Sequence, residues 1–207
     1  MRKYLVLLLF ILTPAMGFSQ LYDYLEDDPA PTIKKHRGLA YSLLETGSGL
    51  GVFYEIPFMN FMHWGAEFDA FMLRDKNEFG YTDYYGYYRT IGKENNVYLF
   101  DLMFTLKQRL FAEDFDDSFR PFITASIGPV FGMNFPEFDR DADGQKLKDQ
   151  YLWTLGGIIG MGLDADVDGK YYFGLRTQYR ILPFSERLGE RKNHSMIDVR
   201  LEIGQRF

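Results

Sequence analysis

The 207-residue chain contains no cysteine, so neither disulfides nor thiolate metal ligands contribute to its structure. It has no excess of basic residues either, because 23 Lys and Arg stand against 29 Asp and Glu. The resulting formal net charge of −6 argues against nucleic acid as a partner. Beyond the first twenty residues, charged side chains interrupt every apolar run, so the sequence predicts no membrane-spanning helix there.

The chain is rich in aromatic residues, with 20 Phe and 15 Tyr, and it begins with a segment typical of secretion. In MRKYLVLLLFILTPAMGFSQ, Arg2 and Lys3 supply positive charge and residues 4–12 form a short apolar core. Gly17 and Ser19 are small residues at offsets that predict cleavage after Ser19. The apolar run is shorter than the ~20 residues that a retained membrane helix requires.

The domain boundaries follow from this segment. We predict a signal peptide over residues 1–19, a flexible, acidic, proline-containing arm over 20–36 and one β-rich domain over 37–207. An exported chain without a second apolar helix is either a soluble exported β-protein or a barrel that crosses a membrane with its strands.

Strand-like alternation recurs along the rest of the chain. In Val97–Arg109, apolar side chains occupy one face, whereas Asp101 and Lys107 occupy the other. Arg37–Phe58 is long enough for two strands, which we expect to be joined at the glycine-rich residues 46–49. These two strands bring the count to eight with Trp64–Met72, Val97–Arg109, Phe119–Phe131, Tyr151–Leu163, Tyr171–Leu182 and Ile197–Phe207.

From the second strand onward, the connections alternate between short and long. The longer ones are Arg74–Asn96, Met133–Gln150 and Pro183–His194. Transmembrane barrels have short turns on the periplasmic side and longer loops outside. An even number of strands puts both chain ends on the short-turn side, so we expect the three larger loops to be extracellular.

The polar faces of the segments carry charges of both signs, whereas the apolar faces of the clear segments carry none near their centres. Because a lysine or arginine facing mid-membrane costs ~2–4 kcal/mol, we expect the charged face to point into the barrel. An eight-stranded barrel is just wide enough for side chains to fill it, and buried charges are tolerated when they are paired. The predicted lumen network comprises Glu55, Glu67, Asp69, Asp101, Lys107, Arg176, Arg180, Arg200 and Glu202.

The predicted fold is therefore all-β: a closed, eight-stranded, antiparallel up-and-down transmembrane barrel with a polar, charge-paired lumen and no diffusion pore. The alternative is a soluble, lipocalin-like barrel, in which the two faces are inverted and an apolar interior holds a lipid. The bulk of the apolar face, and the Tyr, Trp and Phe residues towards the segment ends, favour the membrane barrel.

In this pattern the chain resembles small bacterial outer-membrane β-barrel proteins of the OmpA-like or OmpX-like kind. The resemblance rests on the signal peptide, the eight alternating segments and the C-terminal VRLEIGQRF. It implies a monomer in the outer membrane of a Gram-negative bacterium, in contact with membrane lipid and lipopolysaccharide. It also implies that the barrel-assembly machinery recognises Phe207, Ile203, Leu201 and Val199, although Gln205 departs from the usual apolar or aromatic residue.

Two acidic stretches share the spacing of the first half of a calcium-binding loop. The first, in the loop at 139–150, is a candidate calcium site, with ligands at Asp139, Asp141, Asp143 and Gln145. It lacks the glutamate expected at position twelve of such loops, and a solvated acidic loop is the favoured interpretation. The second, DADVDG at 164–169, is better explained as a hairpin turn. No other cofactor is predicted.

The longest predicted outer loop contains YTDYYGYYR, residues 81–89. Its tyrosines form either an interfacial girdle on strands that project beyond the membrane, which we favour, or a surface that binds a sugar or a partner protein. The residues of this surface aromatic loop are Tyr81, Tyr84, Tyr85, Tyr87 and Tyr88.

The sequence does not predict an enzyme. NHSMID brings His194, Ser195 and Asp198 together, but neighbouring residues of a strand point to opposite faces, which is poor geometry for a nucleophile and its base. The fuller motif of lipid A deacylases is missing. We therefore expect a plugged outer-membrane barrel with a structural, adhesive or surface-interaction role. The alternatives are a barrel that handles small solutes or lipids, by transport or lipid A modification, and the soluble lipid binder.

Overall fold

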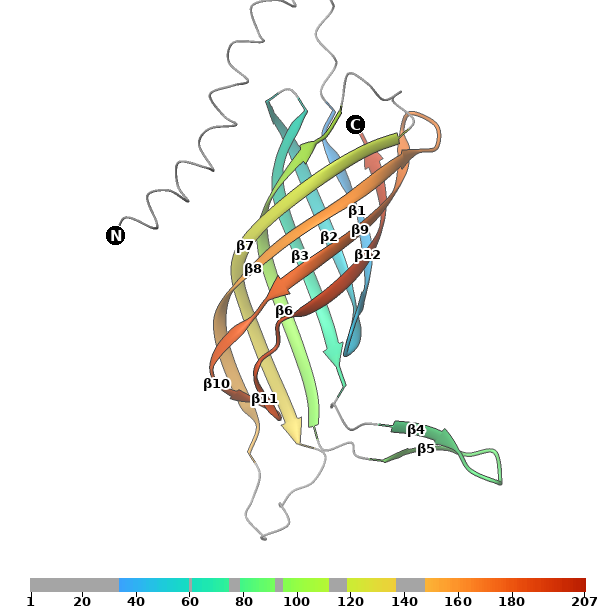
Figure 1. Ribbon diagram of the computed structural model, residues 1–207, viewed down its shortest axis with the longest axis vertical. Helices are drawn as coiled ribbons and strands as arrows, with labels where there is room; N and C mark the ends of the chain where they lie inside the picture. Colours follow the sequence, from blue (N-terminus) through green and yellow to red (C-terminus); the bar gives the residue numbers. More distant parts are fainter. Residues whose placement is uncertain (1–33, 60, 75–78, 92–94, 112–118, 137–147) are drawn as a thin grey trace, which may run out of the picture. The chain divides into compact units, whose positions relative to one another are not determined.

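The structure is a computed structural model that describes residues 34–59, 61–74, 79–91, 95–111, 119–136 and 148–207. Eight strands form one closed antiparallel barrel (Figure 1). In order around the barrel they are β1 (His36–Leu44), β12 (Met196–Arg206), β9 (Tyr171–Ile181), β8 (Gln150–Asp166), β7 (Phe119–Pro136), β6 (Asn95–Arg109), β3 (Met62–Leu73) and β2 (Gly47–Met59). The predicted closed eight-stranded barrel is confirmed. Within the described ranges, no helix is long and apolar enough to cross a bilayer.

Pairing of the first strand with the last closes the barrel. The register runs from His36 opposite Arg206 to Leu44 opposite Asp198, and the backbones of Lys35 and Phe207 exchange two hydrogen bonds of 3.0 Å just beyond it. We call this rim, where β1 begins and β12 ends, the chain-end rim, and the opposite one the loop rim. His36, which the sequence assigned to the N-terminal arm, is therefore the first residue of the barrel, where its side chain is buried.

The two-strand interpretation of residues 37–58 is confirmed, but the turn lies earlier than predicted. Strand β1 ends at Leu44 and β2 already begins at Gly47, so Ser48 and Gly49 pair with Leu43 and Ser42 within the ladder. Gly49 serves packing, because a Cβ there would lie 2.2 Å from the Phe71 ring. Glycine in this stretch therefore marks a close approach between neighbouring strands and not only a turn.

Two further hairpins occur where the sequence predicted long loops. Strands β4 (Phe79–Thr82) and β5 (Tyr88–Ile91) pair only with each other, and so do β10 (Pro183–Leu188) and β11 (Arg191–Asn193). Both hairpins lie in connections that leave the loop rim. The β4–β5 hairpin is a separate sheet and not a continuation of β3 and β6, in contrast to the projecting strands that we favoured.

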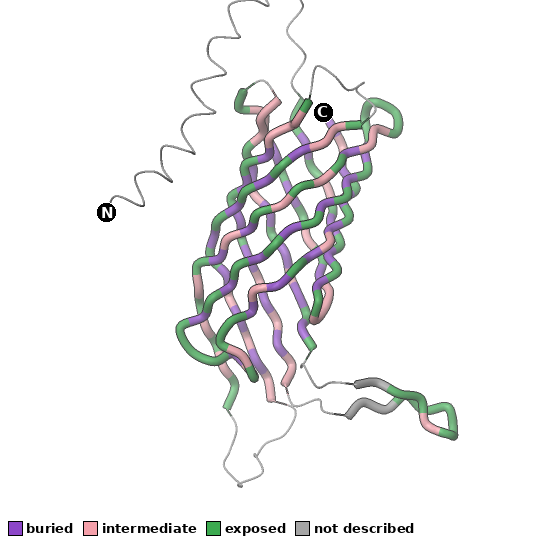
Figure 2. The backbone as a smooth tube through the Cα atoms, in the orientation of Figure 1, coloured by how far each residue is buried: buried purple, intermediate pink, exposed green. Residues whose placement is uncertain are grey.

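Buried and exposed residues alternate along the barrel strands (Figure 2), so one face of each strand points into the barrel and the other points outward. Along β9, for example, exposed and buried residues follow one another without interruption from Tyr171 to Ile181. The exposed side chains are apolar or uncharged and the buried ones include Arg176 and Arg180. Of the exposed positions in the eight barrel strands, only Arg37, at the start of β1, carries a formal charge.

Candidate functional site

The barrel interior is a filled core whose chemistry changes along the barrel axis. All nine residues of the predicted lumen network are buried there. They fall into a central layer of carboxylates and guanidinium groups and a smaller layer near the chain-end rim. Towards the loop rim, apolar side chains replace them. The predicted interior was polar throughout, so this apolar layer corrects the expectation.

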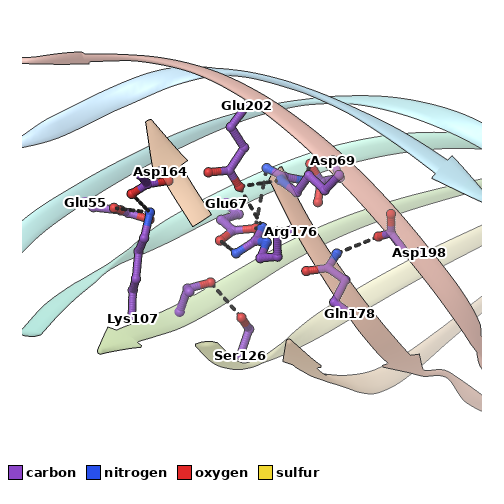
Figure 3. Close-up of polar contacts among 12 residues, drawn as sticks. Glu55, Glu67, Asp69, Lys107, Ser126, Asp164, Arg176, Gln178, Asp198 and Glu202 are labelled. Carbon is purple, nitrogen blue, oxygen red and sulfur yellow. Dashed lines mark hydrogen bonds and ion pairs between the residues drawn. The ribbon is translucent and has the colours of Figure 1, made fainter. Parts of the chain in front are cut away.

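The central layer is built from two arginines that share Glu67 and Glu202. Figure 3 shows Arg176 with these two acids. The guanidinium of Arg176 on β9 donates to both carboxylate oxygens of Glu67 on β3, at 2.9 and 2.7 Å, and lies 3.1 Å from Glu202. Arg200 on β12 donates to Glu202 at 3.0 Å and to Asp69 at 2.5 Å, and lies 3.4 Å from Glu67. Charge-assisted bonds of this kind are about twice as strong as neutral ones.

Arg180 extends the central layer towards the loop rim. It pairs with Asp198 at 3.0 Å, with Asp69 at 3.5 Å and with Asp101. Gln178 donates to the same Asp198 carboxylate at 2.5 Å. The predicted network omitted Asp198, although its place two residues before Arg200 puts it on the same inward face.

The layer at the chain-end rim is centred on Lys107. Its ammonium lies 2.8 Å from Asp164, 3.8 Å from Glu55 and 4.0 Å from the centroid of the Phe122 ring. Glu55 also contacts His36, whose Nδ1 is 3.2 Å from the carboxylate. The sequence did not single out Asp164 for this layer, because it belongs to the acidic stretch that we assigned to a turn.

The rest of that stretch forms the β8–β9 turn. Asp166 accepts a hydrogen bond from the backbone N–H of Gly169 at 2.6 Å, and Asp168 accepts from those of Lys170 and Tyr171 at 3.0 and 2.7 Å. Gly169 has a φ of 73°, a left-handed conformation that favours glycine. Asp164 points into the barrel instead, so the three carboxylates do not converge on one cation.

The apolar layer at the loop rim, which we call the plug, combines inward-facing side chains of the barrel strands with residues of the β9–β12 connection. Leu182, Phe184 and Leu188 come from this connection and are almost completely buried. The guanidinium carbon of Arg180 lies 4.3 Å from the Phe71 ring centroid, where the plug meets the central layer. The plug consists of Leu44, Phe71, Leu73, Val97, Leu99, Met103, Val130, Ile158, Leu182, Phe184, Leu188 and Met196.

Two inward-facing glycines make room for the plug. A Cβ at Gly132 on β7 would lie 2.4 Å from Leu188 Cδ2 and 3.1 Å from Phe184 Cζ. A Cβ at Gly156 on β8 would lie 2.8 Å from Leu182 Cδ2. The β9–β12 connection therefore fits a socket in the barrel wall that only glycine leaves open.

Hydrogen bonds from His194 and Ser195 fasten the plug. The backbone N–H of His194 donates to the Leu182 carbonyl at 3.0 Å, and its Nε2 donates to the Leu188 carbonyl at 3.1 Å. Burial lowers the pKa of His194. The Ser195 hydroxyl accepts from the Leu182 N–H at 3.0 Å and donates to Asn193 at 2.6 Å.

These contacts do not assemble a catalytic triad from His194, Ser195 and Asp198. The hydroxyl of Ser195 bonds to Asn193, and the carboxylate of Asp198 belongs to the central layer. Across the described ranges, no group of three or more His, Asp or Glu side chains could hold a metal ion. The candidate calcium ligands Asp139, Asp141, Asp143 and Gln145 lie outside these ranges, as does the predicted signal peptide.

The remaining predicted residues lie on the outside. The side chains of Phe207, Ile203 and Leu201 are exposed and that of Val199 is half-buried. Phe207 packs under the guanidinium of Arg37 at 4.7 Å, and Arg37 also donates to Gln205 at 2.9 Å. The five tyrosines of the surface aromatic loop are all exposed on the β4–β5 hairpin.

Comparison with known proteins gives the same architecture. Neisserial surface protein A (NspA) is similar in structure, with a TM-score of 0.58 and 10% sequence identity over 87% of this chain and 100% of that protein. A major outer membrane protein from Thermus thermophilus is similar with a TM-score of 0.50 and 11% identity, over 84% of this chain and 99% of its own. No protein-family model matches the sequence, and no curated protein matches it. At these identities the similarity shows the fold.

Proposed function

We propose that this protein is a closed barrel of the bacterial outer membrane that anchors and presents extracellular loops, with a structural or adhesive role and no open pore. The observation that carries the proposal is the separation of charge. Buried ion pairs fill the interior, while the exposed positions of the eight strands carry a single formal charge, on Arg37.

The apolar outer surface of the barrel is suited to contact with lipid. Monomeric soluble proteins seldom expose apolar patches larger than a few hundred Å², whereas here exposed Leu, Ile, Val and Phe side chains recur on all eight strands. About nine to eleven residues suffice for a tilted strand to cross the bilayer, and every barrel strand reaches this length. The charged central layer also argues against the soluble alternative, which requires an apolar interior to hold a lipid.

Bands of aromatic residues near the two rims support the same placement. At the loop rim, the ring centroids of Phe131 and Trp153 are 4.6 Å apart and those of Tyr98 and Phe135 are 6.1 Å apart. At the chain-end rim, Tyr54 lies 6.2 Å from Phe207. Aromatic side chains are enriched at both interfaces of membrane barrels. We therefore propose that lipid and lipopolysaccharide surround the barrel, and that the outward-facing C-terminal residues are accessible to the assembly machinery.

Closure of the interior supports the absence of a pore. A solute entering from the loop rim would have to displace the plug and then part the bidentate pair of Arg176 and Glu67. The second candidate function, passage of small solutes, requires both to open.

Fractionation of cells and a detergent gel of boiled and unboiled samples test the location. A membrane barrel sediments with outer membranes and migrates differently before and after boiling, because the unboiled barrel stays folded. Planar-bilayer recording of the purified protein tests the pore. A soluble periplasmic protein without a mobility shift would refute the proposal, and steady conductance would favour solute passage.

A further inference from the structure

We propose that the β4–β5 hairpin binds an uncharged glycan presented by another surface, through the exposed tyrosines of its tip, chiefly Tyr84 and Tyr85. This inference rests on the proposed function, since the hairpin leaves the loop rim and the loop rim must face the cell exterior for a foreign glycan to reach it.

The first support is exposure. The exposed fractions of the five side chains are 40% for Tyr81, 98% for Tyr84, 82% for Tyr85, 66% for Tyr87 and 72% for Tyr88. Aromatic rings normally supply core or interface area, so rings as exposed as these indicate a binding surface. The two strands pair only with each other, so the barrel sheet does not cover these rings.

The tip of the hairpin is held in one conformation before any ligand arrives. One carboxylate oxygen of Asp83 accepts hydrogen bonds from the backbone N–H groups of Tyr85 and Tyr87, at 3.0 and 2.9 Å. The backbones of Asp83 and Tyr87 are bonded at 2.9 Å, and Gly86 turns the chain with a φ of 82°. A rigid tip loses little conformational entropy on binding, which favours recognition by a short segment.

The rings at the tip are arranged to accept a sugar. The centroids of Tyr84 and Tyr85 are 5.7 Å apart and their planes meet at 84°. Two perpendicular rings form a corner in which a pyranose can lay its C–H face on one ring and its edge against the other. The phenolic hydroxyls can then donate to or accept from the sugar hydroxyls.

Charge decides which glycan fits. The segment 74–94 holds four basic residues and four acidic ones, so its net charge is zero; the residues are Arg74, Lys76, Arg89 and Lys93 against Asp75, Glu78, Asp83 and Glu94. At the tip, residues 82–88 include no cation and Asp83 is engaged by the backbone, whereas Arg89 lies opposite Tyr81 in the register, away from the tip. This surface suits neither sulfated glycans nor the phosphate-bearing core of lipopolysaccharide, which require basic groups.

The residue composition of the hairpin tip also disfavours a protein partner. Protein interfaces are centred on a well-packed core in which aromatic side chains combine with other apolar groups and arginine. Residues 81–88 contain only Tyr, Thr, Asp and Gly, without an aliphatic side chain. Within residues 81–88, hydroxyl-tipped rings without an aliphatic side chain match the alternating C–H and O–H surface of a neutral sugar.

The test uses the full chain, folded in detergent, and polysaccharides immobilised on a sensor surface. Dextran, mannan, galactan and laminarin serve as neutral probes, and heparin and purified lipopolysaccharide as anionic ones. Four proteins are compared: the wild type, Tyr84→Ser with Tyr85→Ser, Tyr84→Phe with Tyr85→Phe, and Lys192→Ser. Lys192 is exposed on the other hairpin and provides the matched control. The mobility shift on boiling verifies that each variant is folded.

We expect the wild type to bind at least one neutral polysaccharide. The serine pair should lower the affinity by roughly tenfold or more, the phenylalanine pair should lower it less because stacking remains, and Lys192→Ser should leave it unchanged. The proposal is overturned if no neutral probe binds, if only the anionic probes bind, or if the serine pair binds as the wild type does. A mobility shift without glycan binding refutes this inference alone, whereas binding by a protein without a shift refutes the membrane barrel.

Discussion

Arg176 and Glu67 join opposite walls of the barrel through a bidentate pair, with nitrogen–oxygen distances of 2.9 and 2.7 Å. Strands β9 and β3, which carry them, lie four strands apart in either direction around the barrel. The number and stagger of the strands set the distance between these two walls, and no backbone hydrogen bond links β9 and β3 directly, so side chains make the contact across the interior. The pair thus braces the barrel across its full width.

Replacement of Glu67 by glutamine should destabilise the barrel strongly. Breaking one partner of a buried ion pair costs about 3–5 kcal/mol, and the remaining contact of Arg176 with Glu202 places this change near the lower figure. Denaturant unfolding of the refolded protein in detergent measures the loss. The double variant Glu67→Gln with Arg176→Gln should recover part of it, because one charge of each sign is removed and Arg200 and Glu202 still pair with each other. The outward-facing Thr177→Ser serves as the control, and a Glu67→Gln variant as stable as this control would contradict the prediction.

Replacement of Gly132 by alanine should weaken the packing of the plug against the barrel wall. In Gly132→Ala, the new methyl group would lie 2.4 Å from Leu188 Cδ2 and 3.1 Å from Phe184 Cζ, so these buried side chains of the β9–β12 connection must move. We expect faster proteolysis between residues 183 and 194 and a stability loss of about 1–3 kcal/mol, as for other overpacked cores.

Gly157→Ala provides the matched control for this experiment. Its Cβ would meet only the Ser126 carbonyl oxygen, at 3.8 Å, and would point out of the barrel. Protease sensitivity and stability should therefore stay at wild-type values. Equal proteolysis of the two alanine variants would show that the plug does not depend on the socket.

A charge introduced on the outer surface should destabilise the barrel more, the closer it lies to the middle of the membrane. Leu175 is exposed at the middle of β9, whereas Tyr171 is exposed on the same face at the end of that strand. In lipid, Leu175→Arg should cost about 2–4 kcal/mol and Tyr171→Arg about 0–1 kcal/mol. Unfolding of both variants in lipid bilayers gives the comparison. If the two arginines cost the same, the outer surface of β9 does not face lipid.

The sequence predicts most of this fold because polar and apolar residues alternate along a strand wherever its inward face is polar and its outward face is apolar. On β9, Arg176, Gln178 and Arg180 alternate with apolar residues, so a period of two determines which face is buried. The opposite charges of the inward-facing residues also predict that acidic side chains of β3 and β6 face arginines of β9 and β12. It cannot predict which acid meets which arginine, because that depends on the stagger of strands around the closed barrel.

The plug escapes prediction for a different reason. Val97, Leu99 and Met103 share the inward face that Asp101 and Lys107 identify, but residues on both faces of this part of β6 are apolar, so the pattern does not show that the interior there is an apolar layer. Leu182 is the last residue of the predicted strand Tyr171–Leu182, and Phe184 looks like part of the loop that follows. Their burial depends on the return of the chain into the barrel, which is set by tertiary packing and by glycines elsewhere in the sequence.

Acid should release the plug through His194. Burial lowers the pKa of this histidine, so in the folded plug it stays neutral at a pH at which the exposed, unfolded form, with a pKa of about 6.5, already binds a proton. The stability of the plug should be independent of pH above about 6.5 and fall as the pH drops below it. The groups that face the ring are the backbones of Leu188 and Arg191, the Phe184 ring and the Arg191 cation, and none of them is a negatively charged side chain that could pair with an imidazolium. Limited proteolysis of the β9–β12 connection between pH about 7.5 and about 5 measures the effect. His194→Gln keeps a donor for the Leu188 carbonyl but does not titrate, so its cleavage should vary less with pH; the same acid sensitivity in this variant would assign the effect to another group.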